Sequence, residues 1–139
     1  MMRTLPLALT ILLLGASGAI AAHATATANE QGEAELARQT AGLVPGKPVR
    51  CVTLDQIDGS TVIDGTAIVY RGLGGTLWVN RPRGAETLRE DDVLVEDIYG
   101  SQLCNLDQIK LVDRVSRMQR GFVGLNAFTP YTKPDKTAP

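Results

Sequence analysis

The fold is decided by the stretch Thr61-Val62-Ile63-Asp64-Gly65-Thr66-Ala67-Ile68-Val69-Tyr70, in which two runs of β-branched residues flank a turn dipeptide. β-Branched side chains fit the pleated surface of a sheet, and Asp-Gly tolerates the positive dihedral angles of a tight hairpin turn. Gly72-Leu73-Gly74-Gly75 then allows a second reversal into Thr76-Leu77-Trp78-Val79. The three segments together predict an antiparallel meander.

The region that follows the meander is predicted to contain a loop and a further strand. Pro82 to Glu90 is polar and indicates a loop, whereas Val93 to Tyr99 has the composition of a strand. We therefore expect an α+β protein that is mostly β: a small antiparallel sheet with a marginal N-terminal helix and one disulfide.

Residues 105–118 fit two patterns. Leu111, Val112, Val115 and Met118 fall on one face of a helix, whereas Ile109-Lys110-Leu111-Val112 also suits a strand followed by a turn at Arg120-Gly121. We favour a strand from Ile109 to Asp113. Phe122-Val123 would then begin the closing strand.

The N-terminal region has the order of a secretory signal peptide. A basic Arg3 is followed by the apolar run Leu5 to Leu14 and then by small residues. The apolar run is shorter than the roughly 20 residues that a membrane-spanning helix needs. We expect a signal peptide over residues 1–24 and a periplasmic or secreted protein without a membrane span.

The chain between the signal peptide and the meander is expected to be a helical or disordered lead-in over residues 25–48. Asn29 and Gly42 are suitable end residues for a helix, but the segment has few large apolar side chains. Pro45-Gly46-Lys47-Pro48 then interrupts the chain. The folded domain is expected to span residues 49–132, with a disordered tail over 133–139.

The chain contains two cysteines, Cys51 and Cys104. In an oxidising compartment such a pair is more often a structural disulfide than two free thiols, and two isolated cysteines fall short of a zinc site. We expect a disulfide, no metal and no cofactor. The tetrapeptide Leu-Asp-Gln-Ile begins at Leu54 and again at Leu106. If this repeat is structural, it predicts equivalent turns that lie side by side.

Several short motifs together resemble small secreted proteobacterial proteins of unknown function. The motifs lie between Val49 and Thr132 and are Arg50-Cys51-Val52-Thr53-Leu54, Val62-Ile63-Asp64-Gly65, Val79-Asn80-Arg81-Pro82, Leu103-Cys104 and Phe128-Thr129-Pro130-Tyr131. Members of that group carry further cysteines near residues 82–84 and near Val123, which this chain lacks. The resemblance implies an exported protein and the same fold class, and it brings no activity with it.

Composition and motifs exclude several common kinds of function. Without Arg3 the chain has near-equal numbers of basic and acidic residues and no basic tract, which argues against nucleic-acid binding. The only histidine, His23, lies in or beside the predicted signal peptide, so the common catalytic triads are unavailable to the exported chain. The sequence therefore favours a protein that is not an enzyme.

Our working hypothesis is an envelope module that binds another macromolecule, such as another envelope protein. A basic face formed by Lys110, Arg114 and Arg117 is the candidate contact, if that segment is helical. Two alternatives stay open. One is a small hydrolase that uses acids around Asp91 and Asp92, and the other is a small-ligand binder with a cavity lined by three apolar residues: Val69, Trp78 and Val95.

Overall fold

The computed structural model describes residues 28–135. The predicted signal peptide, 1–24, and the last four residues of the predicted tail lie outside this range. The described chain is mostly β, as expected, and its elements follow in the order α1 (Ala28–Gln39), β1 (Val44–Pro45), β2 (Cys51–Thr53), β3 (Ile57–Ile63), β4 (Ala67–Gly72), β5 (Leu77–Asn80), β6 (Asp92–Glu96), β7 (Gln102–Cys104), β8 (Gln108–Asp113), β9 (Gln119–Gly124) and β10 (Phe128–Thr132). Short 3-10 turns lie at Leu54–Gln56, Leu73–Gly75 and Ala85–Thr87.

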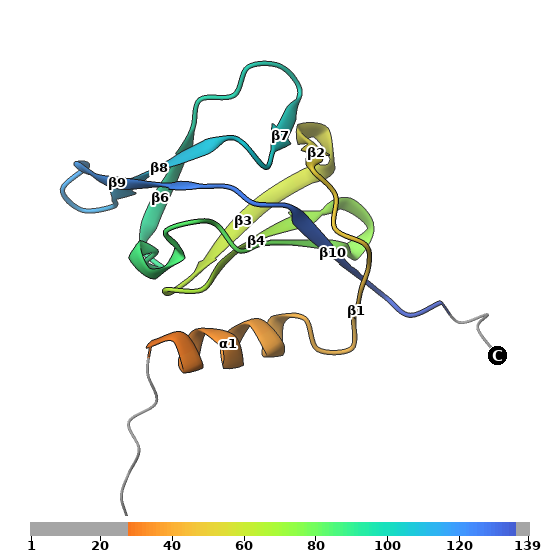
Figure 1. Cartoon of the computed structure of the whole chain (residues 1–139). Helices are drawn as coiled ribbons and strands as arrows, with labels where there is room; N and C mark the ends of the chain where they lie inside the picture. The colour runs from red at the N-terminus through yellow and green to blue at the C-terminus, as the bar shows by residue number, and fades with distance from the viewer. Residues whose placement is uncertain (1–27, 136–139) are drawn as a thin grey trace, which may run out of the picture.

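The strands form two main antiparallel sheets and one short pair (Figure 1). The larger sheet has the order β1-β10-β5-β4-β3, the smaller one has the order β6-β8-β9, and β2 pairs with β7. The predicted meander is confirmed as β3, β4 and β5. Ile63 pairs with Ala67 across the Asp64-Gly65 turn, where only Gly65 takes a positive φ, 58°.

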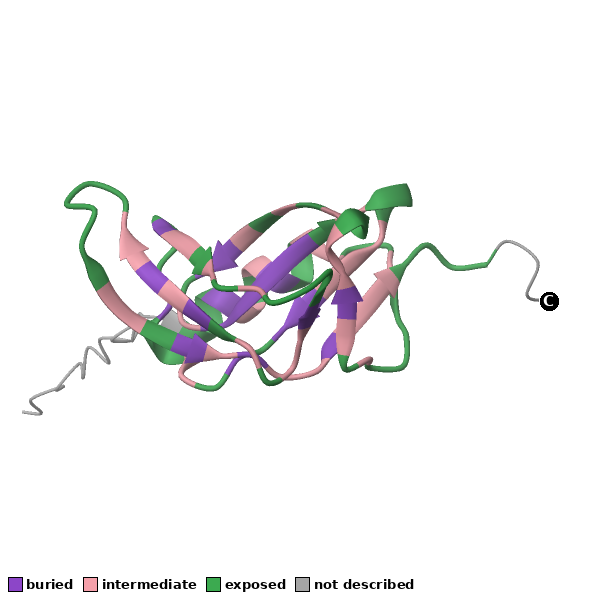
Figure 2. Ribbon diagram, turned by 90° about the horizontal axis from the view of Figure 1, so that it is seen from above, coloured by how far each residue is buried: buried purple, intermediate pink, exposed green. Residues whose placement is uncertain are grey.

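The core lies between the two main sheets. Apolar side chains of both sheets are buried there, and Figure 2 shows the buried segments running through the interior of the sheets while the connecting loops are exposed. The rings of Tyr70 and Phe128 lie 5.8 Å apart at its centre. Around them pack the aliphatic residues Val52, Ile68, Leu88, Leu103, Ile109, Leu111, Val123 and Leu125.

The predicted disulfide joins Cys51 and Cys104. The two residues are direct partners across β2 and β7, with their Cα atoms 4.0 Å apart. The two Leu-Asp-Gln-Ile segments, however, do not lie side by side. Because the pair is antiparallel, Leu54 donates its N–H to Ser101 at one end, whereas Asn105 donates its N–H to Arg50 at the other. That part of the expectation was wrong.

The lead-in segment forms helix α1, which packs against one face of the larger sheet (Figure 1). Leu36 is its one large buried side chain, with 3% of its surface exposed. Gly32 brings the helix close to the sheet, since a Cβ atom there would lie 1.8 Å from the Thr66 Oγ1. Val44 also pairs with Thr132. The folded unit therefore extends N-terminal of the expected boundary at Val49.

The strand interpretation of residues 109–113 is confirmed, and the helical alternative for 105–118 is wrong. The turn that follows lies at residues 114–118, not at Arg120-Gly121, which are within β9. Asp113 explains the position of the turn. Its Oδ1 accepts the N–H groups of Val115 (3.0 Å) and Ser116 (2.7 Å), which favours a turn over a continued strand.

Candidate functional site

The two main sheets are not joined where β3 faces β6. β3 is the last strand of the larger sheet and β6 is the last strand of the smaller one, and no pairing in the described chain connects them. Three clefts of about 510, 380 and 280 Å³ lie along this gap. We call the gap between β3 residues Ser60–Val62 and β6 residues Asp92–Leu94 the seam.

The free edge of β3 presents unpaired backbone groups to the seam. In an antiparallel strand, the N–H and C=O groups of alternate residues point to opposite sides. On β4, Gly72 donates its N–H to the Thr76 carbonyl (2.7 Å), so the backbone groups of Gly72 point to β5. Val69 lies three residues earlier, and its backbone groups therefore point to the opposite side, to β3. Val69 is the partner of Thr61. Thr61 therefore bonds to β4, and its two neighbours point their backbone groups into the seam: Ser60 and Val62.

The same alternation leaves the backbone of Leu94 free on β6. Asp113 donates its N–H to the carbonyl of Met118, so the backbone groups of Asp113 point to β9. The backbone groups of the preceding Val112 therefore point to β6. Val112 is paired with Val93. The next residue on β6, Leu94, therefore points its backbone groups away from β8 and toward the seam. Unpaired N–H and C=O groups thus line the seam on both sides.

The seam is bridged at each end. At one end, Glu90 donates its N–H to the Asp64 carboxylate (2.5 Å) and Gly65 donates its N–H to the Leu88 carbonyl (3.1 Å). At the other end, the Tyr70 hydroxyl donates to Glu96 Oε1 (3.2 Å). Burial raises the pKa of Glu96, and burial together with the nearby Glu96 charge raises the pKa of Tyr70. The Tyr70 hydroxyl therefore stays protonated and remains a donor at neutral pH.

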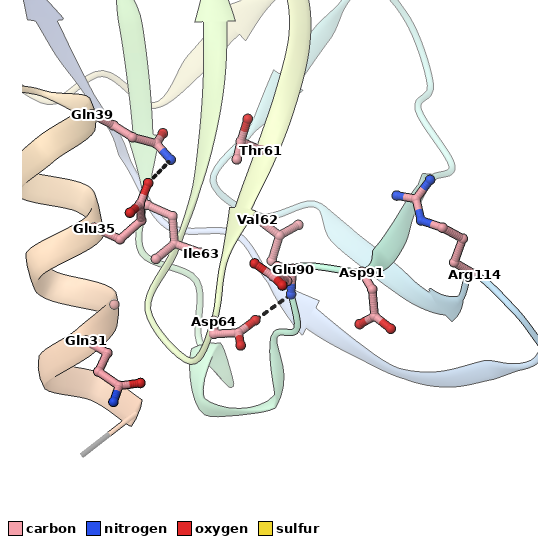
Figure 3. A pocket seen from close by; sticks show the side chains of 11 residues that line it. Gln31, Glu35, Gln39, Thr61, Val62, Ile63, Asp64, Glu90, Asp91 and Arg114 are labelled. Carbon is pink, nitrogen blue, oxygen red and sulfur yellow. Dashed lines mark hydrogen bonds between the residues drawn. The ribbon is translucent and has the colours of Figure 1, made fainter. Parts of the chain in front are cut away.

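The largest cleft opens between α1, β3 and the segment before β6, and its mouth is acidic (Figure 3). Glu35 lines it from α1 but is ion-paired with Arg38. The remaining charged side chains are three carboxylates and one guanidinium, from Asp64, Glu90, Asp91 and Arg114. The mouth of the seam therefore favours a cationic ligand.

The acids of the hydrolase alternative have separate environments. Asp91 lines the cleft and is exposed, whereas the carboxylate of the adjacent Asp92 is buried. The Asp92 Oδ1 accepts bonds from Arg120 Nε (3.0 Å) and Nη2 (2.7 Å), and its Oδ2 accepts the Arg89 N–H (3.0 Å). The hydrogen bonds to Asp92, together with its charge, raise the pKa of Arg120. The buried carboxylate is thus fully occupied by a structural ion pair.

The predicted basic face is not formed as a helical surface. Lys110 lies on β8 and pairs with Asp97, Arg114 lines the acidic cleft, and Arg117 lies in the β8–β9 turn. The structure therefore separates Lys110 from the two arginines and places Arg114 and Arg117 at the end of a hairpin.

The residues expected to line a small-ligand cavity also lie apart. Val69 packs with Leu36 on the α1 side of the sheet, Trp78 packs against the other core cluster, and Val95 is exposed. These three side chains line no common cavity in the described chain.

Comparison of the chain with protein-family models, with curated proteins and with solved structures finds no match in any of the three. The resemblance to secreted proteobacterial proteins therefore stays a prediction. Among residues 28–135, α1 falls short of the length and apolar character that a transmembrane helix requires. Within the same range, histidine, cysteine and acidic side chains form no cluster suited to a metal ion.

Proposed function

We propose that this protein is an exported envelope module that binds an extended, basic segment of another protein in the seam, without catalysing a reaction. The observation that carries the proposal is the free edge of β3, where the backbone groups of Ser60 and Val62 have no strand partner among residues 28–135. An unpaired strand edge is a template for an added strand, and natural proteins use it for peptide recognition.

The dimensions and charge of the seam define the segment that it would take. Gly59 to Ile63 present about 16 Å of strand, at about 3.3 Å per residue, which is enough for four or five residues of a partner. Side chains of a bound strand alternate between the two sides. A strand bound here would lie beside the apolar Val62 and Leu94 of the cleft walls and, at the mouth of the largest cleft, beside the acidic Asp64 and Asp91.

Export predicts a defined mature N-terminus. Three motifs have small residues three and one before a cut: Ala19-Ile20-Ala21, Ala22-His23-Ala24 and Ala24-Thr25-Ala26. We therefore expect the exported protein to begin between Ala22 and Thr27. The disulfide is compatible with the oxidising compartment that export implies. The measurement is the intact mass of the protein from the periplasmic or extracellular fraction. A mass that retains residues 1–24 would contradict export.

The test of the binding site compares Ser60→Pro with Ser60→Ala. Proline removes the Ser60 N–H, which points into the seam, and an edge strand tolerates this loss on its open side. Alanine keeps the N–H and serves as the matched control. We would select random 12-residue peptides displayed on phage against the wild-type protein with its disulfide intact. We expect the selected peptides to be enriched in Lys or Arg and to bind Ser60→Pro at least tenfold more weakly.

The control measurements separate loss of the site from loss of the fold. The melting temperature and the amide spectrum of Ser60→Pro should stay those of a folded protein, and Ser60→Ala should bind the peptides as the wild type does. Amide shifts on titration of an enriched peptide should be centred on Ser60, Val62 and Leu94. Peptides that bind Ser60→Pro as tightly as the wild type, or that carry no excess of basic residues, would refute the proposal.

A further inference from the structure

The hairpin of β8 and β9 projects from the protein (Figure 1), and its turn exposes apolar side chains. We call residues Arg114–Met118 the tip. In the tip, Val115 is 89% exposed and Met118 is 68% exposed. Phe122 on β9 is a further exposed apolar side chain, and it is the strand partner of Lys110. Apolar side chains that protrude from a loop indicate a surface built for contact with something other than water.

The tip is held in one conformation by its own hydrogen bonds. The Asp113 carboxylate accepts the Val115 and Ser116 N–H groups, and the Asp113 carbonyl accepts the Arg117 N–H (2.9 Å). Arg117 has a φ of 59°, and no other non-glycine residue of the described chain takes a positive φ. This conformation is uncommon outside glycine. The exposure of Val115 therefore belongs to a defined turn, in which little order has to be gained on binding.

Two arginines flank the exposed apolar residues. Arg114 and Arg117 take part in none of the ion pairs found among residues 28–135. Asp113, the acid next to Arg114 in the sequence, has its pKa lowered by hydrogen bonds from Ser116 and Val115, and its carboxylate is directed at these backbone groups. The tip thus combines protruding apolar side chains with unpaired positive charge.

We propose that the tip docks on a membrane surface rich in anionic phospholipid. Val115 and Met118 enter the boundary between headgroups and acyl chains, and the guanidinium groups of Arg114 and Arg117 bind the lipid phosphates. The tip is convex, and its few apolar side chains are interleaved with cations. These properties favour a bilayer over a protein partner, because the fluid, anionic headgroup region accommodates such a surface, whereas a protein interface requires close packing. The contact goes beyond the proposed peptide site and leaves the backbone edge of β3 free.

The test measures partitioning of residues 25–139, which contain the whole described fold, onto lipid vesicles. Vesicles of phosphatidylglycerol with phosphatidylcholine are compared with pure phosphatidylcholine by sedimentation at low and high salt. We expect binding only to the anionic vesicles and weaker binding at high salt. Arg117→Gln should lower the partition coefficient about fivefold, since one cation near an anionic surface contributes about 1 kcal/mol. Val115→Ser combined with Met118→Ser should lower it at least as much.

A matched control uses Leu106, which is 73% exposed in a different turn. Leu106→Ser should bind anionic vesicles as the wild type does, and so should Ser60→Pro, whose peptide site is altered. The tip variants should lose vesicle binding and keep peptide binding. This result would show that the lipid site and the peptide site are distinct. Equal binding to both kinds of vesicle, or binding that the tip variants leave unchanged, would overturn the proposal.

Discussion

Reduction of the Cys51–Cys104 disulfide is expected to lower the free energy of unfolding by about 4 kcal/mol. The two cysteines are separated by 53 positions, and in the chain-entropy account a closed loop of this length restricts the unfolded chain by about that amount. For a domain of this size the melting temperature should fall by roughly 15–25 °C. Because β2 and β7 share only three residue pairs, amide exchange should accelerate first around Val52 and Leu103.

The experiment is a thermal melt with and without a thiol-free reductant, combined with hydrogen exchange. The variant in which both cysteines are replaced by alanine is the control, and its melting temperature should be low and insensitive to the reductant. A wild-type melting temperature that reduction leaves unchanged would refute the prediction. A further fall in the reduced control would show that the reductant acts elsewhere.

The meander could be predicted because its determinants are local. The β-branched runs of β3 and β4 and the Asp64-Gly65 dipeptide each indicate the same structure, and the chain needs no distant contact to form the hairpin. The disulfide could be predicted for a similar reason, since it needed only the number of cysteines and the expected compartment.

The β8–β9 turn was misplaced because two turn signals competed. Arg120-Gly121 offered a glycine, whereas Asp113 offered a side chain that accepts the N–H groups of the next residues. The local hydrogen bonds of Asp113 prevailed. Arg120 also donates hydrogen bonds to the buried Asp92. The two residues are 28 positions apart, so no local sequence pattern predicts this contact.

The seam and the tip could not be predicted from the sequence, because the seam depends on which strands lack neighbours and the tip depends on where the β8–β9 turn falls. The composition of β3 indicates a strand but not its place at the end of the sheet. Similarly, Val115 and Met118 fitted the apolar face of a helix, which would bury them. In the hairpin the same residues are exposed, and the basic residues predicted for one face divide between the strand and the tip.

The second large effect is expected from Arg120→Met, which should lower the free energy of unfolding by about 3–5 kcal/mol. The Asp92 side chain is 1% exposed, and Arg120 supplies the only cation that pairs with it in the described chain. Methionine removes the charge and two donors, Nε and Nη2, while keeping most of the side-chain volume. Within residues 28–135 the carboxylate then keeps only the hydrogen bond from the Arg89 N–H (3.0 Å), so its burial becomes costly.

Chemical denaturation of the wild type and three variants identifies the cause of this loss. Arg117→Met removes an arginine from the exposed tip and should change the free energy of unfolding by less than about 0.5 kcal/mol. Arg120→Met combined with Asp92→Leu replaces the buried pair with apolar side chains and should recover most of the stability, because no uncompensated charge remains. A double variant as unstable as Arg120→Met would contradict this explanation and would instead assign the loss to packing of the Arg120 side chain between Thr87 and Asp92.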